Sequence, residues 1–321
     1  MAEKIIDVAV ALILRADGQL LLGQRPEGKP WAGWWELPGG KLEPGETVLQ
    51  ALARELQEEI GITVTESRPW VTYVHRYPQT TVRLAFCFVT GWTGEPRSLE
   101  NQRLQWVVPQ EAAQVGELLP AALPPLRWLQ LPTRYGISAA GSSTGLPVFL
   151  TRLDQALAQG LKLVQWREPA WPDGPQAGSL YAAFEQVLQR CRQAGARLLV
   201  NSIHPEDWWH QADGVHLRAA DAAALTQRPA LPAGALVGVS THSHADILRA
   251  RDLQADFAVL GPVSATPTHP GQAGLGWPAF QAALHDAGLP VFALGGQSPA
   301  TLVQAQSYGA HGIAAIRGIF G

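Results

Sequence analysis

Three glutamates on one predicted helix could hold a divalent metal ion. Glu55, Glu58 and Glu59 are spaced at i, i+3 and i+4, so their carboxylates lie within one helical turn. Carboxylates this close repel one another unless a cation lies between them, and Mg²⁺ bound to a phosphate chain suits such an oxygen cluster. Arg54 can pair with the acids and fix their rotamers. The alternative is that these residues form only a solvated charged face.

The loop and helix that position these acids have clear boundaries. A Pro-Gly pair at 44–45 predicts a turn, and Thr47 with Gln50 predicts a capping box. The helix should therefore span residues 48–60, and Gly61 should end it. The apolar stripe expected to pack on a sheet consists of Leu49, Ala53, Leu56 and Ile60.

The segment GGKLEPGETVLQALARELQEEIGI, residues 39–62, resembles the signature of the Nudix hydrolases without gap or substitution at its fixed positions. By that resemblance, the protein hydrolyses nucleoside diphosphates linked to another moiety, and water attacks phosphorus with the help of Mg²⁺ or Mn²⁺. The implied metal ligands are Glu55, Glu58, Glu59 and the carbonyl of Gly39. The implied supporting residues are Gly40, Glu46 and Arg54.

Residues 4–130 resemble in particular the MutT branch, the oxidised-guanine nucleotide pyrophosphohydrolases. The matching features are DVAVA, Arg25, the ELPGGKLEPGET run, and GEP followed by Glu100, Gln102 and Trp106. The resemblance adds Glu100 to the metal and catalytic site beside Glu55 and Glu58, and it leaves open which glutamate is the base. The implied substrate-binding residues are Arg25, Glu36, Leu37, Pro38, Gly39 and Ala122.

Ala122 is a departure from the MutT pattern, because that branch has there an Asn that reads the modified purine. The departure affects the preference for an oxidised base and leaves the hydrolytic chemistry intact. In the loop before the predicted helix, Trp31, Trp34 and Trp35 could stack on a base or pack beneath the loop.

Strand signals surround the predicted helix. Two apolar runs, 5–14 and 20–23, flank an Asp-Gly turn and predict a hairpin, and further strands are expected at 70–75, 82–92 and 104–108. Together with the resemblance, these signals predict an α+β Nudix domain over residues 1–130, a mixed sheet with helices on its faces.

The second half has a different pattern. After a Pro-flanked stretch at 130–133, eight short apolar strands alternate with helical segments, including helices at 152–159 and 180–194. This order predicts a (β/α)8 barrel of the TIM type over residues 134–321. Residues at the strand ends, where barrel sites lie, are Gln165, Arg167, Asn201, Ser202, Ser240, Thr266, Thr268, Gly295 and Gly296.

These strand ends resemble thiamine phosphate synthase and its relative TenI, through VQWRE, ADGVHL, GVSTHS, GPVSATPT and ALGG. Gly295 and Gly296, with the amides near Ile316 and Arg317, are expected to cradle a phosphate. The departures fall on the chemistry. Pro169 and His269 replace lysines, Ser202 replaces a metal-binding Asp, and Asp221 remains, so the barrel is predicted to have lost synthase activity.

Composition limits the partners. The chain has 321 residues and a net charge of −3, from 24 basic and 27 acidic residues, which gives no electrostatic footprint for nucleic acid or anionic lipid. A small-molecule nucleotide is therefore the expected partner. Cys87 and Cys191 form no CXXC pair and fit a reducing cytoplasm. Asp7 interrupts the first apolar run, which predicts neither a signal peptide nor a membrane span.

Three functions are consistent with these observations. The leading one is a Mg²⁺-dependent nucleoside triphosphate pyrophosphohydrolase, similar to 8-oxo-dGTP diphosphatase, fused to a degenerate phosphate-binding barrel. The second is a bifunctional enzyme of the thiamine pathway. In the third, the barrel senses a ligand and regulates the Nudix half.

Overall fold

The computed structural model describes residues 5–265 and 273–321 of the chain. It divides into two compact units, Met1–Leu131 and Pro132–Gly321. Each unit has its own hydrophobic core, so each is described by itself.

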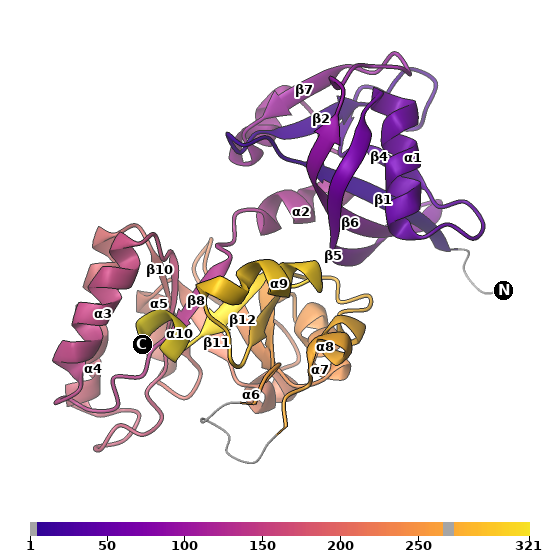
Figure 1. The fold of residues 1–321 in the computed structure, drawn as a ribbon. Helices are drawn as coiled ribbons and strands as arrows, with labels where there is room; N and C mark the ends of the chain where they lie inside the picture. The colour runs from indigo at the N-terminus through magenta and orange to yellow at the C-terminus, as the bar shows by residue number, and fades with distance from the viewer. Residues whose placement is uncertain (1–4, 266–272) are drawn as a thin grey trace. The chain divides into compact units, whose positions relative to one another are not determined.

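The first unit contains two sheets, with strand orders β4-β1-β6-β5 and β3-β2-β7 (Figure 1). Strand β1 pairs parallel with β6 and antiparallel with β4, so the larger sheet is mixed, as the sequence predicts. Its elements are β1 (Ile5–Ile13), β2 (Leu20–Gln24), β3 (Trp35–Glu36), β4 (Gly39–Lys41), α1 (Val48–Ile60), β5 (Thr63–Tyr77), β6 (Thr80–Thr93), β7 (Leu104–Val107), η1 (Pro109–Val115), η2 (Pro120–Ala122) and α2 (Leu123–Trp128).

The predicted first hairpin is only partly correct. The turn at Arg15 forms, with its amide donating to the Gln19 carbonyl at 2.9 Å, and one antiparallel bridge joins Leu14 to Leu20. Beyond that bridge, β1 and β2 belong to different sheets, because β1 pairs with β6 and β2 pairs with β7.

Helix α1 has the predicted ends but a different buried face. Thr47 and Gln50 form the capping box, and Gly61 ends the helix in the left-handed conformation at φ 70°. Leu49 was expected in the apolar stripe but is 38% exposed, whereas Leu52 is fully buried. The buried line has a spacing of four residues and consists of Leu52, Leu56 and Ile60, with Ala51 beside it.

The second unit is a closed barrel of eight parallel strands, in the order β8 to β15, which confirms the predicted barrel. In Figure 1 its helices lie outside the strands. Its elements are β8 (Arg134–Ile137), α3 (Leu146–Ala158), β9 (Leu163–Trp166), α4 (Gly178–Gln193), β10 (Arg197–Asn201), α5 (Glu206–Gln211), β11 (Gly214–Leu217), α6 (Ala219–Ala224), β12 (Leu236–Thr241), α7 (His244–Asp252), β13 (Phe257–Leu260), α8 (Trp277–Ala283), β14 (Val291–Leu294), η3 (Pro299–Thr301), α9 (Leu302–Ser307), β15 (Gly312–Ala315) and α10 (Arg317–Phe320).

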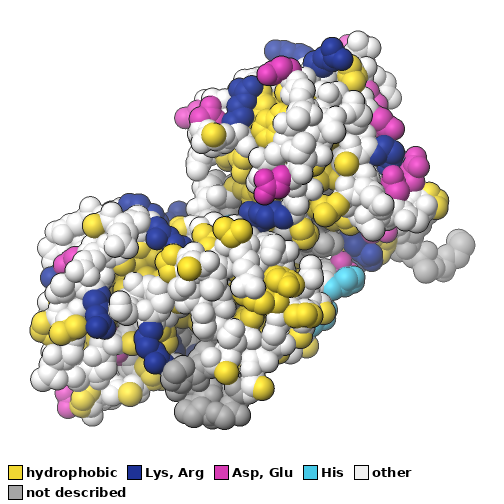
Figure 2. All heavy atoms as spheres, in the orientation of Figure 1, with side chains coloured by type: hydrophobic (Ala, Val, Ile, Leu, Met, Phe, Trp, Pro, Cys, Tyr) yellow, Lys and Arg dark blue, Asp and Glu magenta, His cyan; other side chains and the backbone are white. Residues whose placement is uncertain are grey.

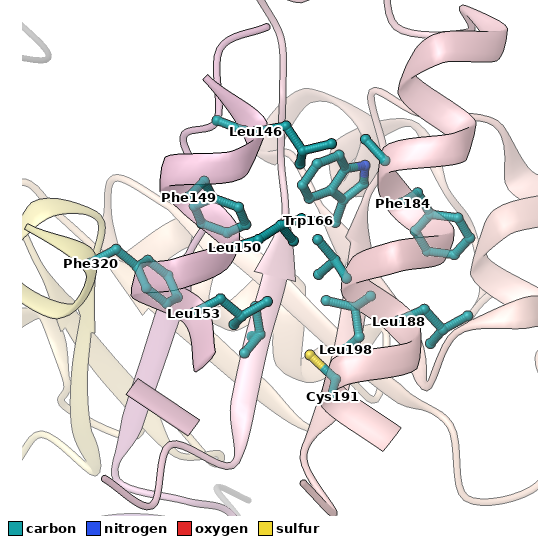
Figure 3. Packing of buried hydrophobic residues seen from close by; sticks show 14 of the residues in the cluster. Leu146, Phe149, Leu150, Leu153, Trp166, Phe184, Leu188, Cys191, Leu198 and Phe320 are labelled. Carbon is teal, nitrogen blue, oxygen red and sulfur yellow. The ribbon is translucent and has the colours of Figure 1, made fainter. Parts of the chain in front are cut away.

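Helices α3 and α4 cover β9 and β10 with a continuous apolar layer (Figure 3). Trp166 on β9 lies fully buried at its centre, with Phe149 of α3 at a ring-centroid distance of 6.2 Å. Helix α3 begins six residues before the predicted start at residue 152, because Pro147 is compatible with a first helical turn.

The surface in Figure 2 shows acidic and basic side chains interspersed, without an extended basic area on that face. Within the described residues, no helix is both long enough and apolar enough to cross a bilayer.

The corrected face of α1 leads to a stability prediction. Leu52→Ala should lower the free energy of unfolding of the first unit by about 2–4 kcal/mol, because it leaves a cavity under the helix. Leu49→Ala, the matched control, should change it by less than about 0.5 kcal/mol. Native-state hydrogen exchange of the α1 amides measures both values in this unit alone. Equal losses would mean that the helix buries the predicted stripe after all.

Candidate active site

The site in the first unit begins with two glycines of β4, of which Gly40 lies against α1 and Gly39 lies against β1. A Cβ atom on Gly40 would lie 2.0 Å from the Glu55 carboxyl carbon, and one on Gly39 would lie 2.1 Å from the Ala9 carbonyl oxygen. Gly39 also has φ 144°, a conformation that other residues rarely adopt. Gly40 therefore lets the Glu55 carboxylate lie directly against the β4 backbone, and Gly39 lets β4 lie close to β1.

Arg54 organises the acidic face of α1. Its Nε donates to Glu46 at 2.8 Å, and its Nη1 donates to Glu55 at 2.9 Å and to Glu58 at 3.1 Å. Its Nη2 donates to the Lys41 carbonyl at 3.0 Å. The hydrogen bond from Arg54 and one from a backbone amide lower the pKa of Glu46 to about 2. The supporting role predicted for Glu46 and Arg54 remains a prediction, and their contacts agree with it.

Glu59 lies on the side of α1 that faces the Gly39 backbone. The Gly39 amide donates to its carboxylate at 3.2 Å, and no cation within the described residues bonds to it. Burial, together with the negative charges of Glu36, Glu100 and Glu55, raises the pKa of Glu59 to about 7, although the Gly39 bond opposes the shift. The carboxylate is thus short of positive charge.

Glu100 is brought to the same place by a loop that docks on the end of α1. Gln102 accepts from the Glu100 amide at 3.0 Å and donates to the Glu59 carbonyl at 3.0 Å. Lys29 lies 2.6 Å from the Glu100 carboxylate. No regular spacing in the sequence connects Lys29 or Gln102 with the helix acids, so these contacts are not predictable from the sequence alone.

One hollow connects these groups, and Lys29, Glu36, Glu59 and Glu100 line it together with Pro38. Among residues 5–265 and 273–321, no three His, Cys, Asp or Glu side chains converge as a formed metal site. The reason is visible in the contacts, because Arg54 draws Glu55 and Glu58 to one side while Lys29 holds Glu100. The donors nevertheless suit Mg²⁺ or Mn²⁺, since all are carboxylate or carbonyl oxygens.

Of the predicted substrate-binding residues, Glu36 and Pro38 line this hollow, whereas Arg25, Leu37, Gly39 and Ala122 do not. Arg25 donates to both carboxylate oxygens of Glu36, at 2.8 and 2.6 Å, and to the Pro30 carbonyl at 2.7 Å. Burial raises the pKa of Glu36 even though Arg25 opposes it. Leu37 is buried, and the Pro38 carbonyl accepts from the Ala11 amide at 2.8 Å. The side chain of Leu37 is therefore part of the core, and the substrate-binding roles of Leu37 and Pro38 stay predictions.

The three loop tryptophans differ in exposure. Trp35 is buried in the core, whereas Trp31 is 40% exposed and holds a left-handed φ of 64°. The ring of Trp31 lies 4.7 Å from Trp34 and 6.1 Å from Tyr77. Ala122 is buried, and the neighbouring Ala121 backbone bonds to Tyr77. Tyr77 is therefore an aromatic side chain close to Ala122, with Trp31 beside it, and Tyr77 was not singled out from the sequence.

Two of the residues predicted to cradle a phosphate in the barrel are glycines with positive φ. Gly295 and Gly296 follow β14 with φ 99° and 68°, and a Cβ on either would come within 3 Å of Pro262 or Ser264. Ile316 and Arg317 follow β15 and begin the short α10. The predicted residues Thr266 and Thr268, with His269, lie outside the described residues.

Asp221 is the one metal-binding carboxylate of the synthase family that this chain keeps, and its oxygens already accept hydrogen bonds from other side chains. It accepts from Arg218 at 2.7 and 2.9 Å and from the Ser202 hydroxyl at 2.5 Å. Burial alone would raise its pKa, but these bonds lower it. The guanidinium of Arg167 forms no hydrogen bond or ion pair with another described residue, and burial lowers its pKa. Arg167 and Arg218 therefore share this part of the mouth with the carboxylates of Glu168 and Asp221.

Gln165, Asn201 and Ser240 belong to a hydrogen-bonded chain inside the barrel. Asn201 donates to Gln165 at 2.9 Å, and Gln165 donates to the Tyr135 hydroxyl at 3.1 Å. His216 connects Tyr135 to Ser240, at 3.1 and 2.9 Å. Burial lowers the pKa of His216 to about 3, so the imidazole stays neutral. Gln165 and Asn201 therefore hold one another, and Ser240 is the half-buried end of the chain.

Comparison with known proteins defines the class. Residues 4–129 match the NUDIX domain, and residues 135–319 match the family described as thiamine monophosphate synthase. The chain belongs to the thiamine monophosphate synthase family through its barrel, and its first unit is a Nudix domain of the MutT type. Both resemblances drawn from the sequence are confirmed.

Three relatives show what this chain is similar to. An 8-oxo-dGTP diphosphatase of Haemophilus influenzae is 42% identical over 38% of this chain and 88% of its own length. A CTP pyrophosphohydrolase of Escherichia coli is 41% identical over 38% of this chain and 88% of its own length. A thiamine-phosphate synthase of Synechococcus is 33% identical over 57% of this chain, but only 51% of that protein is covered. The Nudix relatives are pyrophosphohydrolases that act on phosphoric anhydrides.

The raised pKa of Glu59 predicts how the metal-free first unit responds to pH. Its pKa of about 7 in the fold lies above its ordinary value of 4.5, so the folded state binds the proton more tightly and loses stability as pH rises from 5 to 8. Glu59→Gln should remove this loss. In EDTA, the gain in the free energy of unfolding of the variant over wild type should be larger at pH 8 than at pH 5 by on the order of 1–3 kcal/mol.

Hydrogen exchange of the α1 amides at both pH values tests this. Glu58→Gln is the matched control, because Glu58 is 58% exposed and already pairs with Arg54, so no gain at pH 8 is expected. A Glu59→Gln effect that is the same at pH 5 and pH 8 would contradict the prediction.

Proposed function

We propose that the first unit is a Mg²⁺-dependent nucleoside triphosphate pyrophosphohydrolase that releases the nucleoside monophosphate and pyrophosphate, with Mn²⁺ as a possible substitute. The observation that carries the proposal is the Glu59 carboxylate, which has no cationic partner among the described residues and shares one hollow with Glu36 and Glu100. The names of the similar Nudix proteins, 8-oxo-dGTP diphosphatase and CTP pyrophosphohydrolase, support this reaction class.

In the proposed mechanism, Glu55, Glu58, Glu59, Glu100 and the Gly39 carbonyl would hold the metal. The chemistry supplied by a divalent ion there would be neutralisation of phosphate charge and activation of water. One of these glutamates orients the attacking water and accepts its proton, and the contacts do not distinguish which one. Arg54 bonds to Glu55 and Glu58 at 2.9 and 3.1 Å, so both carboxylates would have to turn from Arg54 toward Glu59 to share the metal.

We further propose a damaged purine, 8-oxo-dGTP, as the preferred nucleotide. The exposed face of Trp31, with Tyr77 behind it, could stack on any base, because stacking discriminates poorly between bases. Ala122 has no side-chain group that could read the edge of a base, so the discrimination is expected to be modest. The similarity to a CTP pyrophosphohydrolase makes CTP the second candidate substrate.

A nucleotide panel tests the reaction and the preference together. With Mg²⁺, wild-type protein should release pyrophosphate from 8-oxo-dGTP with a higher kcat/KM than from dGTP or CTP. Glu58→Gln and Glu59→Gln should each lower turnover by orders of magnitude while the fold survives, because each removes a charged metal ligand. EDTA should abolish the activity. Near-wild-type turnover in both variants would refute the assignment of this face, and a higher kcat/KM for CTP would replace the proposed substrate.

We propose that the barrel binds a phosphate-bearing small molecule at Gly295 and Gly296 and makes no thiamine phosphate. The lysine positions of the family are Pro169 and His269 here, and the Asp221 carboxylate is already paired with Arg218. A pyrimidine diphosphate would therefore lack both counter-charge and metal support. We also place the protein in the cytoplasm, because Cys87 and Cys191 are free and buried.

The full chain should form no thiamine phosphate from the pyrimidine diphosphate and thiazole phosphate in the presence of Mg²⁺, as detected by chromatography of the products. Formation at a steady rate by the full chain, abolished by Gly295→Val, would show that the barrel is an active synthase and favour a bifunctional enzyme of the thiamine pathway.

A further inference from the structure

Lys29 lies where a cation would be expected if Glu100 binds metal. Its ammonium is 2.6 Å from Glu100 and lines the same hollow as Glu36 and Glu59. A lysine ammonium carries a positive charge at neutral pH. The Lys29 ammonium thus faces the carboxylates of Glu36, Glu59 and Glu100, of which Glu36 is also paired with Arg25.

The loop around Lys29 holds it at this position. Gly28 turns the chain with φ 86°, and the Lys29 amide donates to the Pro26 carbonyl at 3.4 Å. Arg25 then fixes both sides of the loop, because it donates to the Pro30 carbonyl at 2.7 Å and its carbonyl accepts from Gly33 at 2.9 Å. The backbone of Lys29 is therefore tethered beside the hollow, and only its long side chain needs to rotate.

The ion pair itself is easily exchanged. The side chains of Lys29 and Glu100 are 48% and 42% exposed, and a pair so open to water contributes little to stability. A divalent ion that coordinates several carboxylate oxygens has a stronger electrostatic attraction to the same acids than one ammonium has.

We propose that Lys29 is a displaceable internal cation: it holds Glu100 in the metal-free enzyme, yields Glu100 to the divalent metal, and then contacts the phosphate chain of the substrate. This inference rests on the hydrolase function proposed above. It predicts two opposite effects of removing the ammonium. Metal binding without nucleotide becomes tighter, because a competitor is lost, whereas nucleotide binding becomes weaker, because a phosphate contact is lost.

Mn²⁺ titration of the full chain, followed by electron paramagnetic resonance without nucleotide, tests the first effect. Lys29→Gln should bind Mn²⁺ roughly threefold to tenfold more tightly than wild type, the scale of one removed like charge near a solvent-exposed site. Lys29→Arg keeps the charge and should stay near wild type. Arg103→Gln removes one positive charge from an exposed side chain three residues after Glu100 and is the control for net charge.

The KM for 8-oxo-dGTP, measured at saturating Mg²⁺, tests the second effect. Lys29→Gln should raise it several-fold with a smaller change in kcat, and Lys29→Arg should largely restore it. A residue that only stabilised the loop would weaken both metal and nucleotide binding, which would overturn the proposal.

The remaining outcomes are equally decisive. Equal Mn²⁺ affinities for wild type and Lys29→Gln would overturn the role of Lys29 while an active wild type leaves the hydrolase function standing. A wild type that neither binds Mn²⁺ nor hydrolyses any nucleotide would remove the hydrolase function, and the role of Lys29 with it.

Discussion

The arrangement of the first unit depends on how one guanidinium balances a row of acids. Glu55 and Glu58 extend from α1 three residues apart, and Glu46 approaches from the preceding loop, so their charges would repel without Arg54. The planar fork of Arg54 reaches all three and the Lys41 carbonyl as well. This ties β4, the loop and α1 into one rigid piece. Lysine could not replace it, because an ammonium lacks that fixed set of directions.

The sequence predicted best those features that are set by neighbouring residues. The capping box at Thr47, the left-handed end at Gly61 and the eight apolar barrel strands all depend on local chemistry, and all are present. The buried face of α1 was wrong at Leu49, because apolar residues at helical spacing allow two adjacent stripes and only the packing against the sheet selects one. The first hairpin failed similarly, since a good turn does not decide which strands pair beyond it.

The acidic residues of the candidate site could be predicted from the sequence, but the residues that form hydrogen bonds and ion pairs with them could not. Lys29 and Glu100 are 71 positions apart, and Gln102 and Glu59 are 43 apart, so no spacing rule connects them. Pairing across such distances is decided by how the 26–34 loop and the 94–103 loop fold against α1. The consequence is chemical, because these partners determine which carboxylates are free for a metal ion and which are already neutralised.

That distinction separates the two halves of the chain more sharply than their motifs do. In the barrel, Asp221 accepts two bonds from Arg218 and one from Ser202, so its charge is fully used within the protein. In the first unit, Glu59 accepts a single bond from the Gly39 amide and has its pKa raised to about 7. A carboxylate whose charge is left uncompensated costs folding energy, and that cost is recovered when a cation binds. The electrostatics therefore favour a cation site beside Glu59 and none at Asp221.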